Sequence, residues 1–190
     1  MRGPEDSRWR RAAAVILAAA AGAAWASDWL PLAQDGIHDP ASPALRVLQE
    51  PAEALSSLPR DTAGNKVDWM RALERGVIRP RASIDPGTTV RLRTTEVLLK
   101  NTSNAFMVRF PHRQHTAWID CVSCHDGLFE TKAGATRLNM LMILSGEKCG
   151  QCHGAVAFPL TECARCHSVA RDSAAAAAFG AGLVRDPEKP

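Results

Sequence analysis

The chain of 190 residues contains no tyrosine, and only 5% of its residues are aromatic. It has no paired-carboxylate motif, no glycine-rich nucleotide loop, and no metal-ligand cluster apart from one set of cysteine motifs. It has no basic stripe suited to nucleic acid, and beyond residue 26 no apolar run is long enough to span a membrane. These absences argue against a nucleic-acid partner, against a membrane span in the mature chain, and against an enzyme that works through its own side chains.

All six cysteines belong to three copies of one motif, Cys-x-x-Cys-His, so none is left for a structural disulfide. Two thiols at this spacing can add to the two vinyl groups at one edge of a porphyrin, and the next histidine can then bind the iron. Zinc knuckles and disulfide scaffolds also use Cys-x-x-Cys pairs, but neither needs a histidine after each pair. The sequence therefore predicts three covalently attached haem c groups. The predicted attachment residues are Cys121, Cys124, Cys149, Cys152, Cys163 and Cys166, and the predicted proximal iron ligands are His125, His153 and His167.

Residues 1–26 have the pattern of a cleaved secretory signal peptide. Four arginines precede a short apolar run over residues 12–21, and Ala24-Trp25-Ala26 forms a small-x-small cleavage site. The alternative is an uncleaved anchor, although the run is shorter than the roughly 20 residues that a spanning helix needs. The arginine pair at residues 10 and 11 lacks the rest of a twin-arginine signal. We therefore expect a periplasmic protein, either free, bound to a membrane complex or carried to the cell surface.

The charge of the mature chain is nearly balanced, with 19 basic and 18 acidic residues after position 26. Each haem adds two propionates, and ferric iron leaves one positive charge on each porphyrin, so the oxidised protein would carry a net charge of about −2. The basic isoelectric point of the whole polypeptide is therefore a poor guide to its partners.

Composition divides the mature chain into three parts. Residues 27–104 lack cysteine and are rich in proline; within them the pattern predicts a capped helix over 65–76 and a half-exposed strand over 88–93. We expect this part to wrap or dock onto the haem-binding part, with a free-standing domain as the alternative. Residues 105–170 hold all three motifs and are too few to enclose three porphyrins, so the haems themselves should form the core. The tail, residues 171–190, is expected to be helical or flexible.

Three further histidines, His38, His112 and His115, could close the distal side of the irons. His112 and His115 directly follow an apolar, strand-like run that ends in Phe110-Pro111. A proline at the first helical position would start a turn on which histidines three residues apart lie on one side. The alternative is a pair of solvated surface histidines.

The Phe-Pro-His-x-x-His segment and the three motifs, separated by 23 and then 9 residues, resemble the trihaem c7-type cytochromes of class III. The resemblance covers about residues 105–170. It implies a c7- or c3-like multihaem fold, with short helices and irregular segments around three haems and a short N-terminal β-strand element. It also implies periplasmic electron carriers with low-spin, bis-histidine haems. By the same resemblance His112 would pair with the haem of His125, and His115 with the haem of His153.

The third haem lacks its expected partner, because Ser145 stands where the resemblance places a distal histidine for the haem of His167. Met140 and Met142 lie on an apolar segment, 138–144, that should be helical, so only one of the two can face an iron. Resemblance to a variant group favours Met140, which precedes the second motif by nine residues, whereas helix geometry favours Met142. His38, in a turn, and an open coordination site are the remaining possibilities.

These observations predict an electron-transfer protein that relays electrons between periplasmic or membrane-bound redox proteins. One alternative is a haem enzyme or small-ligand sensor that uses an open third haem at His167. Another is a haem-bearing subunit of a larger redox assembly, with residues 27–104 as its docking element.

Overall fold

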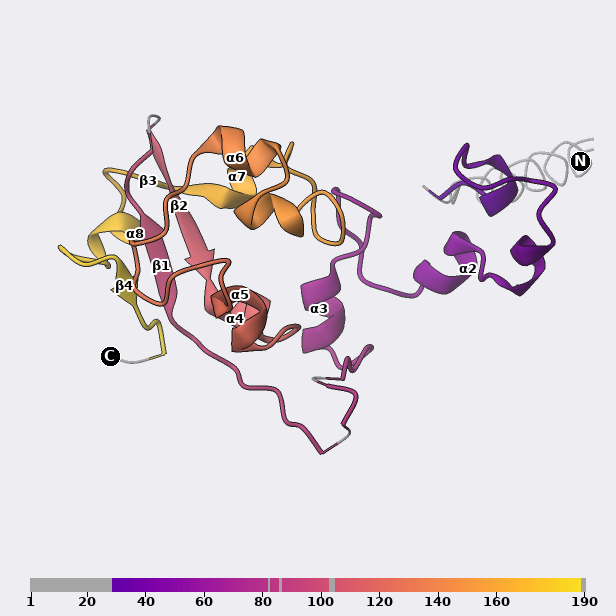
Figure 1. Cartoon of the computed structure of the whole chain (residues 1–190), viewed down its shortest axis with the longest axis horizontal. Helices are drawn as coiled ribbons and strands as arrows, with labels where there is room; N and C mark the ends of the chain where they lie inside the picture. Colours follow the sequence, from indigo (N-terminus) through magenta and orange to yellow (C-terminus); the bar gives the residue numbers. More distant parts are fainter. Residues whose placement is uncertain (1–28, 82, 86, 103–104, 189–190) are drawn as a thin grey trace, which may run out of the picture. The chain divides into compact units, whose positions relative to one another are not determined.

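The structure of the chain is a computed structural model that describes residues 29–81, 83–85, 87–102 and 105–188 (Figure 1). The chain divides into two compact units, Met1–Leu58 and Pro59–Pro190. The expected signal peptide, residues 1–26, lies outside the described residues. In the part of the chain that is described, no helix has both the length and the apolar character needed to cross a membrane.

The described part of the first unit consists of short helices joined by turns. They are the 3₁₀ helices η1 (Leu32–Gln34) and η2 (Pro43–Val47) and the α-helix α2 (Pro51–Leu55). A proline opens both η2 and α2, at a position where its missing N–H removes no helical hydrogen bond. Leu32 is buried, and its backbone N–H donates a hydrogen bond of 3.1 Å to the Glu50 carboxylate.

The second unit is organised around an antiparallel sheet with the strand order β3-β2-β1-β4. The strands are β1 (Glu96–Leu99), β2 (Phe106–Pro111), β3 (His167–Ala170) and β4 (Val184–Arg185). Leu98 of β1 faces Arg109 of β2, and Met107 of β2 faces Val169 of β3. β2 confirms the strand-like run predicted before His112. The sheet thus pairs β2, which leads into the two predicted distal histidines, with β3, which follows the third motif.

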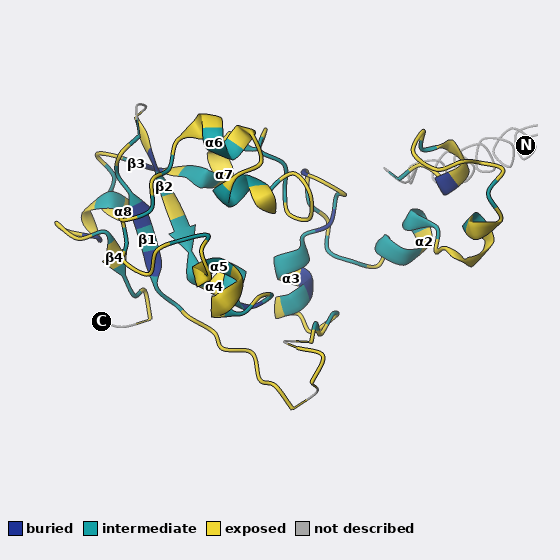
Figure 2. Cartoon of the chain, viewed as in Figure 1, coloured by how far each residue is buried: buried dark blue, intermediate teal, exposed yellow. Residues whose placement is uncertain are grey.

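The polypeptide core of this unit is small. Its main cluster consists of Leu98, Met107, Val169 and Phe179, and Leu98 is fully buried (Figure 2). Many large apolar side chains near the cysteine motifs are exposed instead, among them Leu141 at 77% and Val156 at 83%. The protein chain alone therefore leaves much apolar surface uncovered around the motifs.

Each Cys-x-x-Cys-His motif is built on a single helical turn. α5 (Cys121–His125) comprises the whole first motif, η3 (Lys148–Gln151) begins the second, and α7 (Cys163–Cys166) spans the third up to His167. Asp120 caps α5, because its carboxylate accepts a hydrogen bond of 2.7 Å from the backbone N–H of Cys121. A helical turn keeps the two thiols and the following imidazole within reach of one porphyrin edge.

Two further helices position candidate ligands. α4 (His112–Thr116) follows β2 directly, and α6 (Met140–Leu144) lies within the segment 138–144 predicted to be helical. Asn139 caps α6 by accepting a hydrogen bond of 2.9 Å from the Met142 N–H. A Cβ atom at Gly150 would lie 2.0 Å from the backbone oxygen of Ile143. Glycine inside the second motif therefore lets η3 pack directly against the backbone of α6.

The helix predicted over 65–76 is present but shorter, as α3 (Trp69–Glu74). It begins later because Asp68 is the N-cap, where its carboxylate accepts a hydrogen bond of 2.9 Å from the Arg71 N–H. Gly76 ends the helix as predicted, with a φ of 68° and hydrogen bonds of a Schellman motif through its own N–H and that of Val77.

The strand predicted over 88–93 is wrong, because these residues have no ladder partner and β1 begins only at Glu96. Two arginines that were expected on the exposed face of that strand bind side chains instead. Arg91 donates to the Asp120 carboxylate at 2.7 and 2.8 Å, and the Nε of Arg93 donates to the Thr95 hydroxyl at 2.8 Å. The tail contains a helical turn, α8 (Ala174–Ala177), and the unexpected strand β4, which pairs with β1.

Candidate functional site

The two predicted distal histidines of α4 have their ring nitrogens fixed by backbone oxygens. His112 Nδ1 lies 2.9 Å from the oxygen of Thr95, and His115 Nδ1 lies 2.9 Å from the oxygen of Pro111. A carbonyl oxygen can only accept, so Nδ1 carries the proton in both rings and Nε2 keeps its lone pair for a metal. The Phe110 ring packs against both imidazoles, with centroid distances of 4.9 Å to His112 and 4.3 Å to His115.

Two of the predicted proximal histidines show the same arrangement. His125 Nδ1 lies 3.0 Å from the backbone oxygen of Phe129, and His153 Nδ1 lies 3.2 Å from that of Phe158. Outer hydrogen bonds of this kind orient metal-binding imidazoles and leave Nε2 as the ligand atom. The donor set therefore fits haem iron, which takes its axial ligands from imidazole nitrogens.

The structure brings two of the predicted ligand histidines, His115 and His153, close together. The ring centroids of His115 and His153 are 6.2 Å apart, with an angle of 62° between the rings. When two imidazoles bind one metal from opposite sides, their ring centroids are about 6 Å apart, because each metal–nitrogen bond is about 2 Å long and each centroid lies beyond its nitrogen. A charge on the His125 ring would lower the pKa of His112, so these two rings lie within electrostatic range of each other. The distance between His115 and His153 is therefore the one expected of two ligands of the same iron, and the full pairing that the resemblance implied stays a prediction.

Burial affects the protonation of the distal pair. Burial lowers the pKa of both His115 and His112, and in each ring the hydrogen bond to a backbone oxygen opposes that shift. Repulsion from His153 lowers the pKa of His115 further, and repulsion from Arg93 does the same for His112. Both imidazoles are consequently neutral at neutral pH, which is the form that binds a metal.

The six thiols are unpaired and lie partly or fully at the surface. Burial is the main cause that raises the pKa of Cys124, Cys149 and Cys166, and neighbouring thiols add to the effect. These three thiols are therefore protonated at neutral pH. In the described ranges, no group of three or more histidine, cysteine or acidic side chains is arranged to hold a metal ion by itself.

The surface around the motifs is apolar where a haem would lie. α6 has the sequence Met-Leu-Met-Ile-Leu, and Met140, Leu141 and Leu144 are 46%, 77% and 62% exposed. Val122, inside the first motif, is 63% exposed. A helix that is apolar on all sides is stable only when it is covered. Porphyrin faces would supply that cover, so these side chains fit the predicted cofactor.

The methionines considered as distal ligands of the third motif lie on α6. Ser145 ends α6 and is exposed, and its hydroxyl donates a hydrogen bond of 2.8 Å to the Leu141 oxygen. Met142 lines a cavity of about 420 Å³ together with His125 and Phe129, which places it beside the first motif. Met140, two residues away, projects from the opposite side of α6, about 200° around the helix.

His38 belongs to the first unit, where its Nδ1 lies 2.7 Å from the Asp35 carboxylate and its backbone N–H donates to the same group. That contact orients the ring and leaves its Nε2 available, as the Nδ1 contacts do in His112, His115, His125 and His153.

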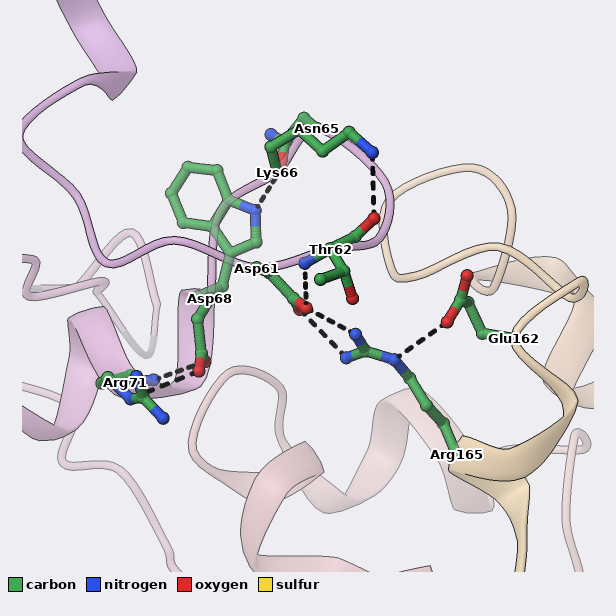
Figure 3. A network of polar contacts seen from close by, with 9 residues as sticks. Asp61, Thr62, Asn65, Lys66, Asp68, Arg71, Glu162 and Arg165 are labelled. Atoms are coloured by element: carbon green, nitrogen blue, oxygen red, sulfur yellow. Dashed lines mark hydrogen bonds and ion pairs between the residues drawn. The ribbon is translucent and has the colours of Figure 1, made fainter. Parts of the chain in front are cut away.

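Residues 59–76 are held to the motif-bearing part by contacts that the sequence did not predict. Asp61 binds the Arg165 guanidinium of the third motif through two hydrogen bonds (Figure 3). The Trp118 Nε1 donates to the sulfur of Met70 at 3.0 Å. An aspartate and an arginine 104 residues apart give no signal in one sequence, so only the fold reveals this pair.

Comparison with known proteins relates part of the chain to haem proteins. Residues 108–169 match the family model described as cytochrome c7 and related cytochrome c. A solved c7-type three-heme cytochrome domain is 34% identical over 42% of this chain and 99% of that domain, with a TM-score of 0.37. The C-terminal hexaheme fragment of GSU1996 is 35% identical over 41% of this chain and 49% of that fragment, with a TM-score of 0.36. The search of the curated proteins found no match.

Proposed function

The chain belongs to the family of cytochrome c7 and related cytochrome c, and from this premise we propose that it is a periplasmic electron-transfer protein with three haem c groups. A multihaem c-type cytochrome transfers electrons; the number of haems, the compartment and the ligands are the proposed details. The observation that carries the proposal is the pair His115 and His153, whose rings are 6.2 Å apart with both Nδ1 atoms on backbone oxygens.

Haem c, when bound, supplies an iron that takes up and releases single electrons. The role of this chain is to hold that iron in one ligand environment during the exchange. Backbone oxygens fix the four histidines His112, His115, His125 and His153, so their Nε2 atoms need little rearrangement when the charge of the iron changes. The apolar residues of α6 would exclude water from the porphyrin faces.

For the third haem we propose His167 as the proximal ligand and Met140 as the distal ligand. Ser145 cannot supply an imidazole, and Met142 lines the cavity next to His125. Met140 occupies the other side of α6 and is 46% exposed, so its thioether is available to a haem that covers it. A thioether ligand raises the potential of a haem relative to an imidazole ligand.

Absorption and EPR spectra of the oxidised protein test this assignment, with Met140→Ala and Met142→Ala as matched variants. We expect low-spin iron throughout, a sulfur-to-iron charge-transfer band, and loss of that band in Met140→Ala only. Loss of the band in Met142→Ala instead would overturn the choice between the two methionines. A high-spin haem in the unaltered protein would favour an open third site and a catalytic or sensing role, and a spectral change in His38→Ala would make His38 the ligand.

The expected partners are periplasmic or membrane-bound redox proteins, and the first unit is available as a docking element. Deletion of all of residues 27–104 would remove β1, which pairs with two other strands of the sheet. A truncation of this part must therefore end at Leu58, where the first unit ends. If docking depends on this unit, electron exchange with a purified partner should slow in the truncated protein while its haem spectrum stays unchanged; an unchanged rate would count against docking.

A further inference from the structure

A loop formed by residues 59–68 presents one carboxylate to the third motif (Figure 3). The loop is closed by backbone hydrogen bonds from Asp61 to Lys66 at 2.9 Å and from Asp68 to Pro59 at 2.8 Å. Val67, within it, is only 3% exposed. Asp61 is thus held by a rigid loop, and the Thr62 N–H fixes its carboxylate further through a hydrogen bond of 2.6 Å.

The partner of Asp61 is Arg165, which lies between the two cysteines of the third motif. Its NH2 group lies 2.5 Å from Asp61 Oδ1, and its NH1 group lies 3.0 Å from Oδ2. Two parallel contacts of this kind fix both the place and the plane of a guanidinium. The side chains of Asp61 and Arg165 are 19% and 33% exposed, so solvent screens the pair only in part. Arg165 accordingly holds the pKa of Asp61 below its usual range, and the carboxylate is ionised at neutral pH.

Arg165 also extends the contact toward the second motif. Its guanidinium carbon lies 5.2 Å from the centroid of the Phe158 ring, and that ring packs against His153 at 4.4 Å. Glu162 makes a weaker ion pair with the Arg165 Nε at 3.5 Å. The cation therefore belongs to the helical turn that carries the third motif and contacts the ring that packs against His153, and Asp61 is its closest charged partner.

We propose that Asp61 is a positioning residue for the third haem, acting through Arg165 to set the potential of the iron bound by His167. The proposal rests on the proposed function, because it needs a haem on Cys163 and Cys166. A guanidinium beside a haem stabilises the reduced iron, which carries one positive charge fewer, and a bound carboxylate offsets that effect. Asp61 lies outside residues 108–169, which match the family model, so the residue that adjusts the potential of the third haem would come from outside the matched part of the chain.

The test is a redox titration in which each haem is followed separately by NMR. Asp61→Asn leaves the positive charge of Arg165 without its main partner, so the midpoint potential of the third haem should rise and that of the first should not move. Arg165→Gln should shift the third potential downward, and the double variant should lie between the two. Asp68→Asn is the matched control, since it removes a carboxylate of the same loop that caps α3.

The outcomes separate this proposal from the proposed function. Full haem content with an unmoved third potential in Asp61→Asn would overturn the positioning role, even if the variant unfolds at a lower temperature. An equal shift in Asp68→Asn would also overturn it, because the effect would then not depend on Arg165. Absence of haem from the Cys163–Cys166 peptide in a mass spectrum would overturn both proposals.

Discussion

Replacement of His115 by alanine removes the imidazole whose centroid lies 6.2 Å from that of His153. If the two rings bind the same iron, one haem of three loses its distal ligand, and about one third of the total iron should become high-spin. EPR integration of the oxidised protein measures that fraction. His112→Ala is the matched variant: it should convert an equal fraction at the haem of His125, and the double variant should convert about two thirds.

The cost of the same change to folding can also be worked from the structure. The His115 ring packs 4.3 Å from Phe110, and its Nδ1–H satisfies the Pro111 oxygen. Loss of that partly buried contact and hydrogen bond should destabilise the protein by about 2–3 kcal/mol, so the variant should still fold. Added imidazole should enter the vacated space and restore the low-spin signal. Iron that stays low-spin in His115→Ala, without added imidazole, would refute the assignment of His115.

Three further outcomes follow from the sheet and the loop. Glu96 is 9% exposed and pairs with Arg185 at 2.7 Å, so Glu96→Gln should lower the free energy of unfolding, measured in urea, by about 2–4 kcal/mol; a loss below about 1 kcal/mol would contradict this. Leu98 is fully buried, and Leu98→Ala should lower the free energy of unfolding by about 3–4 kcal/mol in the same assay. A near-neutral result would contradict the assignment of Leu98 to the core. Arg165 lowers the pKa of Asp61, so the ion pair stabilises the folded state fully above the unfolded carboxyl pKa of about 3.9, and this stabilisation is lost as the pH falls through the folded pKa. The difference in unfolding free energy between the unaltered protein and Asp61→Asn should therefore disappear in acid. A difference that does not depend on pH would argue against the ion pair.

The relation to c7-type cytochromes could be predicted from the sequence, because the cofactor dictates the spacing of the cysteine motifs. A thiol pair followed directly by a histidine suits covalent haem attachment, whereas zinc and disulfide sites need no such histidine. Phe110-Pro111 before His112 marks the end of a strand and the start of a turn. The helix before Gly76 and the helical segment containing Met140 were also predictable, since capping residues and apolar spacing are local signals. Each of these features is encoded within about ten neighbouring residues.

The features that the sequence did not predict depend on distant residues. β4 has only two residues, Val184–Arg185, and exists because β1 offers a free edge and Glu96 binds Arg185. The strand expected over 88–93 had the right alternation but no partner strand; side-chain contacts to Asp120 and Thr116 hold that segment instead. Alternation describes a side-chain pattern, whereas a strand also requires a ladder.

The same limit applies to the distal ligand of the proposed third haem. Local rules placed Met140 and Met142 on one helix but could not assign either to an iron, because the assignment depends on which motif each face of α6 meets. The cavity shared by Met142 and His125 is tertiary information, as is the contact between Asp61 and Arg165.

The central claim is that each of the three motifs holds one covalent haem. Mass spectrometry of the mature protein, first intact and denatured and then after proteolysis, tests it most directly. We expect a mass increase equal to three haem groups, with one haem on each of the peptides that contain Cys121, Cys149 and Cys163, and no free thiol. Fewer than three haems, free or disulfide-bonded cysteines in any motif, or zinc in place of iron would contradict the claim.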